Sequence, residues 1–137
     1  MNTASDHRDP ETYAVIGAAM EVHKELGSGF AREVYLDALE VEFGLREIPF
    51  VRNPPIMIHY KEVPLGAPLQ VDFVCFDEVM LELKAVRELP EEDSSRVLQH
   101  LRATGLRRAL LMNFGALRLD YKRLVIRGGK PESFSAT

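Results

Sequence analysis

Hydrophobic residues recur at helical spacing in the first third of the chain. From Glu11 to Leu26 the apolar side chains return every three or four positions, which predicts an amphipathic helix. We expect this helix to begin at Asp9-Pro10 and to end at Gly27–Gly29, because proline suits the first helical turn and glycine suits a helix end. A second helix is predicted from about Ala31 to about Gly44. Its expected inward side chains are Val34, Tyr35, Ala38, Leu39 and Val41.

The pattern after the second helix is typical of extended chain. Residues 48–60 (IPFVRNPPIMIHY) predict a strand that Pro54-Pro55 interrupts or confines to a sheet edge, because proline cannot donate to a strand ladder. The stretch Val63–Pro68 predicts a turn. Two strands of a hairpin are expected next, over Leu69–Phe76 and Val79–Val86.

The last third alternates helix and strand. A helix is predicted after Pro90, because acidic residues lead it and Gly105 follows it. The continuous apolar run RRALLMNFG (107–115) favours a strand inside a sheet, and DYKRLVIRG (120–128) predicts a last strand. The element order is therefore α-α-β-β-β-α-β-β. That order indicates a mixed sheet with helices packed on it, in the α/β or α+β class.

The length of the chain, 137 residues, bounds it to one ordinary domain. We expect a flexible N-terminal arm at 1–10, a single domain at 11–128 and a flexible tail at 129–137. An apolar fraction of 46% with 28% charged residues is typical of a globular protein. The sequence shows neither a membrane-spanning apolar run nor a signal-peptide pattern, so we expect a cytoplasmic protein with no membrane partner. The lone Cys75 has apolar neighbours and is expected to be an inert core thiol.

Charge is segregated along the chain although the net charge is only −4. Between Ser94 and Lys130 a single acid, Asp120, accompanies nine basic residues, so this segment carries +8. The nine are Arg96, Arg102, Arg107, Arg108, Arg118, Lys122, Arg123, Arg127 and Lys130. Such a segment steers polyanions, or alternatively forms a solvated surface that balances the acidic first half.

Three charged residues interrupt the most apolar stretch, VDFVCFDEVMLELKA (71–85): Asp72, Glu82 and Lys84. Strand side chains alternate faces, so Glu82 and Lys84 share one face, and Asp72 joins them only in some hairpin registers. A two-residue turn at Asp77-Glu78 would put Asp72 on the wrong face. We therefore predict a three-residue loop or a bulge near Asp77–Val79, pairing Asp72 with Lys84 and leaving Glu82 diagonal to Asp72.

Two chemistries fit these three charges. Neighbouring carboxylates are stable when a divalent cation such as Mg²⁺ lies between them, and a lysine beside them can orient water and stabilise charge on phosphorus. The alternative is a cross-strand ion pair between Asp72 and Lys84, with Glu82 at the sheet edge. The spacing alone favours the ion pair.

A family resemblance shifts that balance. The stretch PLQVDFVCFDEVMLELKAV resembles the Asp…Glu-x-Lys core of the PD-(D/E)XK nuclease superfamily. Three further stretches, LGSGFAREVYLDALEVEFGLREIPFVRN, YKEVPLG and LQHLRATGLRRALLMNFG, are similar to a small bacterial family called GxxExxY proteins. The resemblance covers roughly Tyr13 to Arg127.

The resemblance implies a restriction-endonuclease-like α/β fold and a nuclease activity. Asp72 and Glu82 match the metal-binding acids of the superfamily and Lys84 its catalytic lysine. The Leu83 carbonyl is a further expected ligand, and Mg²⁺ or Mn²⁺ the expected metal. The implied reaction is phosphodiester hydrolysis in a nucleic acid partner, DNA before RNA. Homodimerisation or a partner protein is left open.

The chain departs from the family at two places. Gly29 and Tyr35 match the GxxExxY motif, but Arg32 stands at the glutamate position. Glu33 follows it, rotated by about 100° on a helix, so either a second metal site is weak or Glu33 serves it from a shifted helix. Relatives tend to carry Gln and Tyr in the helix after the core, where this chain has Arg96 and His100.

These departures keep two functions open. Arg32, Arg96, His100 and Arg102 are expected to bind nucleic acid, and His100 is alternatively a partly buried helix histidine. The rival function is a nuclease-fold module that binds nucleic acid or a protein partner without turnover.

Overall fold

The computed structural model describes residues 9–127. Within them the helices are α2 (Pro10–Leu26), α3 (Arg32–Leu45) and α4 (Glu91–Thr104). The strands are β1 (Phe50–Arg52), β2 (Ile56–Tyr60), β3 (Val63–Leu69), β4 (Phe73–Cys75), β5 (Val79–Lys84), β6 (Arg108–Asn113) and β7 (Asp120–Val125). Residues 1–8 of the expected arm, and the whole expected tail, lie outside the described residues.

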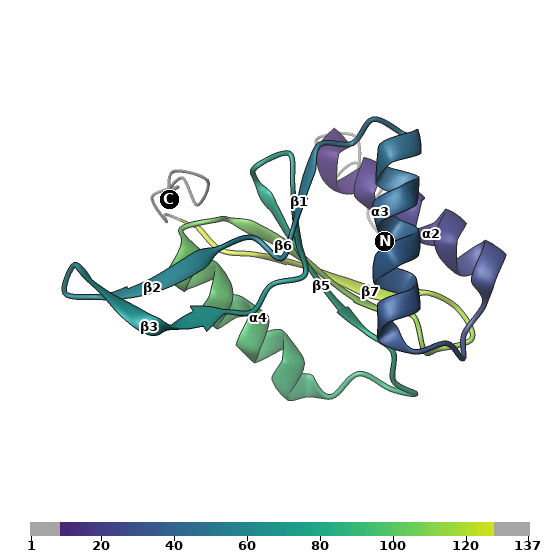
Figure 1. Cartoon of the computed structure of the whole chain (residues 1–137). Coiled ribbons are helices and arrows are strands. Elements are labelled where there is room, and N and C mark those ends of the chain that lie inside the picture. The colour runs from purple at the N-terminus through teal and green to yellow at the C-terminus, as the bar shows by residue number, and fades with distance from the viewer. Residues whose placement is uncertain (1–8, 128–137) are drawn as a thin grey trace.

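Five strands form a mixed sheet in the order β1-β4-β5-β6-β7. The pairing of β5 with β6 is parallel, and the other neighbours are antiparallel. Helices α2 and α3 cover one face, whereas α4 and the separate β2–β3 hairpin lie on the other (Figure 1). The predicted mixed sheet flanked by helices is therefore confirmed. None of the helices within residues 9–127 has the length and apolar character that crossing a bilayer requires.

Strand β5 is buried from both sides, which explains its apolar sequence. Leu81 and Leu83 pack in the core beneath α2 and α3, and Met80 packs in the core beneath α4. Glu82 lies on the same face as Met80 and is only 7% exposed. Strand β6, the parallel neighbour of β5, lies inside the sheet and is apolar, as the continuous apolar run in the sequence predicted.

The predicted inward face of α3 was partly wrong. Tyr35 and Leu39 are fully buried, but Val34 and Val41 are exposed. The buried stripe continues instead through Leu36 and Phe43. At about 100° per residue, Val34 and Val41 lie on the opposite side of the helix from this stripe.

The predicted turn at 63–68 was also wrong, because this stretch is strand β3. The turn consists of Lys61 and Glu62, both with positive φ (49° and 68°), and it joins the paired residues Tyr60 and Val63. A two-stranded sheet has only edge strands, so the prolines of β3 are tolerated there. This strand and the break at Pro54-Pro55 add two strands to the predicted order.

Asp9 fixes the start of α2 and binds two basic residues. Its carboxylate accepts hydrogen bonds from the Thr12 N–H (3.1 Å) and hydroxyl (2.6 Å), and it pairs with Arg108 and Arg123. Burial would raise the pKa of Asp9, but the hydrogen bonds from Thr12 and Arg123 and the charge of Arg108 outweigh it and lower the pKa. Part of the basic C-terminal third therefore balances acids within the fold.

Candidate functional site

The hairpin between β4 and β5 has an odd loop, as predicted, but the loop begins one residue earlier than expected, which shifts the strand register by two residues. Cys75 pairs with Val79 across the three-residue loop 76–78, and Phe73 pairs with Leu81. Extending this register by one residue aligns Asp72 with Glu82, so Lys84 is the diagonal neighbour and the predicted pairing was wrong. Positive φ at residues 76 and 77 (57° and 58°) lets the loop close directly after Cys75.

Asp72 is held from three directions. Its Oδ2 accepts a hydrogen bond of 2.7 Å from the Leu83 N–H, and its own carbonyl accepts one of 2.9 Å from the Asn53 N–H. Its Oδ1 lies 2.7 Å from Nη1 of Arg32. The side chain is 15% exposed, so the carboxylate is largely removed from water but fully partnered.

Tyr35 positions Arg32 at the start of α3. The Tyr35 hydroxyl donates to the Gly27 carbonyl (2.6 Å) and accepts from the Phe30 N–H (3.2 Å), which fixes the loop before the helix. Its ring stacks on Phe114 with the centroids 4.9 Å apart. One turn before this anchor, the Arg32 guanidinium reaches the strand acid. The side chain at the family's glutamate position thus brings a positive charge to Asp72.

Glu82 is paired with His100 from α4. His100 Nδ1 and Glu82 Oε2 lie 2.6 Å apart. Nδ1 donates in this contact, because an ionised carboxylate only accepts. The His100 side chain is 15% exposed, which matches the partly buried alternative, and its partner is a residue of the predicted site itself.

Lys84 meets an acid that the sequence analysis did not single out. Its Nζ lies 3.9 Å from Oδ2 of Asp93, in the first turn of α4. The other oxygen of Asp93 accepts a 2.7 Å hydrogen bond from Nη1 of Arg96. Asp93, Arg96 and His100 are spaced by three and four residues and so share one helix face. That spacing was the signal that could have found Asp93.

Two predicted site residues take no part in these contacts. Glu33 is exposed, and the contact from the first turn of α3 to Asp72 comes from Arg32. Arg102 is exposed near the end of α4. The structure thus gathers Asp72, Glu82 and Lys84 with Arg32, Arg96 and His100, and it adds Asp93.

The segments that follow β5 and β6 are tied together beside Lys84. Asn113 pairs with Lys84 in the parallel register, and its Oδ1 accepts from the Val86 and Gly115 N–H groups at 2.9 and 3.0 Å. A Cβ on Gly115 would lie 2.4 Å from the Val86 carbonyl oxygen, so only glycine fits. The end of β5 that carries Lys84 is therefore held by backbone contacts.

The donors suit a divalent cation in kind. Two carboxylates and a backbone carbonyl leave positions for water, a combination that Mg²⁺ and Mn²⁺ accept. A strand residue directs its N–H and C=O to the same neighbour, so the Leu83 carbonyl faces the side where its N–H meets Asp72. Arg32 and His100 already occupy one oxygen of each acid, however. Across residues 9–127 no three His, Cys, Asp or Glu side chains are grouped to hold a metal.

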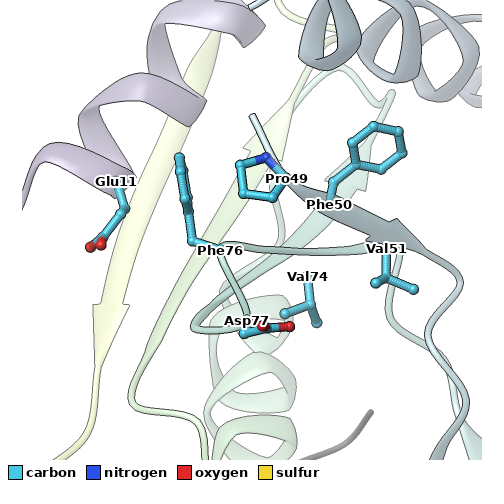
Figure 2. Close-up of a pocket in the computed structure, with 7 residues that line it drawn as sticks. All are labelled: Glu11, Pro49, Phe50, Val51, Val74, Phe76 and Asp77. Carbon is cyan, nitrogen blue, oxygen red and sulfur yellow. The ribbon is translucent and has the colours of Figure 1, made fainter. Parts of the chain in front are cut away.

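A pocket of about 300 Å³ lies near the other end of the β4–β5 hairpin, at its turn. Its lining side chains come from the start of α2, from β1 and the residue before it, from β4, and from the β4–β5 loop (Figure 2). The lining is mostly apolar, with carboxylates only from Glu11 and Asp77. None of the predicted site residues lines this pocket. The candidate site lies at the opposite end of the β4–β5 hairpin from the turn.

Comparison with known protein families gave a match over most of the chain. A family model described as the PD-(D/E)XK nuclease superfamily matches residues 9–124, which include every predicted site residue. The comparisons with curated proteins and with solved structures gave no match.

Proposed function

Because the chain belongs to the PD-(D/E)XK nuclease superfamily, we propose that it is a metal-dependent nuclease that hydrolyses phosphodiester bonds in DNA, with RNA as the second substrate to test. Members of the superfamily generally use divalent metals such as Mg²⁺ and act on nucleic acid. The observation that carries the proposal is the gathering of Asp72, Glu82 and Lys84 on one side of the β4–β5 hairpin. Burying acidic side chains beside a lysine at a strand end costs free energy and is not needed for folding. Such clusters are typical of functional sites.

Each residue has a proposed role. Asp72, Glu82 and the Leu83 carbonyl hold the divalent cation, which supplies Lewis acidity towards water and phosphate oxygens. Lys84 orients the attacking water and stabilises charge that develops on phosphorus. Arg96, whose side chain is 38% exposed beside Asp93, binds a backbone phosphate.

Three other residues complete the proposal. Arg102 extends the basic surface along α4 towards the flanking phosphates. His100 orients Glu82 and reaches the substrate through its free ring edge. When Arg32 no longer pairs with Asp72, its guanidinium is proposed to bind a substrate phosphate. Glu33, in the same helical turn, stays a predicted metal ligand.

Within the superfamily we assign the chain to the GxxExxY proteins. Gly29 has a φ of 125°, which favours glycine, and Tyr35 makes the hydrogen bonds that anchor the loop before α3. These contacts support a structural task for the first and last positions of the motif. The central position, here Arg32, is free to differ because its side chain points to the site rather than to the core.

A cleavage panel tests the activity. Single- and double-stranded DNA and RNA are incubated with Mg²⁺ or Mn²⁺, and Lys84→Ala is compared with Lys122→Ala, an exposed lysine on β7. We expect Lys84→Ala to slow cleavage by about 100-fold or more and Lys122→Ala to leave it near the wild-type rate. Absence of cleavage on every substrate, together with absence of metal binding, would contradict the proposal.

A second function has its own support, namely a nuclease-fold module that binds nucleic acid or a protein partner without turnover. Both acids that are proposed to bind metal already have an internal partner, Arg32 on Asp72 and His100 on Glu82. An acid whose oxygen is already taken up by an internal hydrogen-bond donor is less available to a divalent cation. Nucleic-acid binding that is unchanged by Asp72→Ala and by metal removal, without cleavage, would favour this function. A cytoplasmic location and a homodimer or partner protein stay predictions from the sequence.

A further inference from the structure

Asp93 is a buried acid that the helix itself does not require. Its side chain is 5% exposed, although it lies in the first turn of α4 beside two exposed glutamates, Glu91 and Glu92. Those two already place negative charge at the helix N-terminus, where the dipole favours it. The N-cap is Pro90, which has no N–H. Asp93, the third residue of the helix, therefore cannot accept the hydrogen bond that an acid at this position usually receives from the N-cap. Burial of a third carboxylate here therefore needs another explanation.

The contacts of Asp93 all lead to the proposed site. Oδ1 accepts from Arg96, and Oδ2 lies 3.9 Å from the Lys84 ammonium, too far for a hydrogen bond. Within the described residues, Oδ2 is buried with no hydrogen-bond partner. The carboxylate thus holds Lys84 by charge while leaving the ammonium's three N–H donors for other acceptors.

We propose that Asp93 is a positioning residue for Lys84, a role that rests on the proposed nuclease function. Its charge draws the flexible lysine side chain toward the α4 face of β5, on the side where Glu82 lies. Asp93 also accepts a hydrogen bond from the Arg96 guanidinium. One buried acid therefore positions both the proposed catalytic lysine and the proposed phosphate-binding arginine. A lysine without this partner samples many rotamers, and a misplacement of about 1 Å lowers a rate by about 100-fold.

Asp93→Asn tests this role, because it keeps the shape and removes the charge. The matched control is Glu92→Gln, which makes the same charge change at an exposed position one residue earlier. We expect Asp93→Asn to lower kcat by about 10- to 100-fold, with a smaller rise in KM because Arg96 also loses its partner. Asp93→Glu should recover part of the loss, because it restores the charge. Equal kcat values for Asp93→Asn and Glu92→Gln would overturn the proposal.

A double-mutant cycle in unfolding free energy separates this inference from the activity. Asp93→Asn and Lys84→Met are measured singly and together by chemical denaturation, which requires no cleavage. A non-additive pair supports the contact even if the protein cleaves nothing, in which case only the proposed function fails. Strictly additive effects would overturn the positioning role. If Asp93→Asn does not fold, the same cycle is run with Asp93→Ala, which also removes the charge.

Discussion

Replacing Arg32 by glutamine should strengthen divalent-cation binding. Arg32 Nη1 lies 2.7 Å from Oδ1 of Asp72, the acid proposed to hold the metal. A cation that binds this oxygen must first displace the guanidinium. Glutamine cannot bring a positive charge to Asp72, so the variant no longer carries that competing interaction.

The size of the effect follows from the geometry of the pair. Two unit charges about 4 Å apart interact by about 4 kcal/mol at an effective dielectric constant of about 20. The Arg32 side chain is 39% exposed, and solvent screening therefore reduces the net contribution. A value of about 1–2 kcal/mol is reasonable for a charge-assisted contact that is half screened. Since 1.4 kcal/mol is a factor of ten, metal affinity should rise by about 5- to 30-fold.

Isothermal titration calorimetry with Mg²⁺ and Mn²⁺ measures this change directly. The control is Arg118→Gln, which removes the same charge from an exposed residue between β6 and β7. Without metal, Arg32→Gln should also be less stable, by about 1–2 kcal/mol, and added metal should restore more stability to it than to the wild type. An affinity equal to that of Arg118→Gln, or lower, would refute the idea that Arg32 competes with the metal.

Three further predictions concern Asp9, Gly115 and Cys75. The pKa of Asp9 lies below its ordinary value of 3.8, so its charge stabilises the fold above that pH and the benefit is lost as pH falls through the folded pKa. Asp9→Asn, an equally good N-cap, should be less stable than wild type by about 2 kcal/mol at pH 7, with the gap closing below pH 3.8 in denaturation curves. Gly115→Ala should destabilise by about 1–3 kcal/mol, whereas Gly44→Ala, with no atom within 4 Å of the new Cβ, should not. Burial raises the pKa of Cys75 to about 12, so iodoacetamide at pH 8 should label it only after unfolding.

Local patterns predicted the elements well because local physics forms them. The apolar spacing of residues 11–26, closed by proline and glycine, predicted α2 to within a residue. The alternation of Asp72, Glu82 and Lys84 with apolar residues required an odd loop, and the loop has three residues. The sequence did not predict where the β4–β5 loop begins. That position depends on which residues adopt a positive φ once the core has packed.

Partners across the fold could not be predicted, because they depend on how α3 and α4 dock on the sheet. Arg32 and Asp72 are 40 residues apart in sequence, and neither position indicates the other. His100 could have faced solvent or a nucleic acid, and only the docking of α4 brings it to Glu82. Asp93 resembles a helix-start acid in sequence, and its burial next to Lys84 alone distinguishes it from Glu92.

The sequence by itself determined the mixed sheet and the three charged residues of the hairpin, because these rest on periodicity and short-range spacing, and its resemblance to a family indicated the superfamily. Only the tertiary structure decided what each charge meets: a guanidinium at Asp72, an imidazole at Glu82 and a buried carboxylate beside Lys84. The reason is physical. Burying a charge is costly unless a partner is present, and the chain supplies those partners from helices that only packing brings to the sheet.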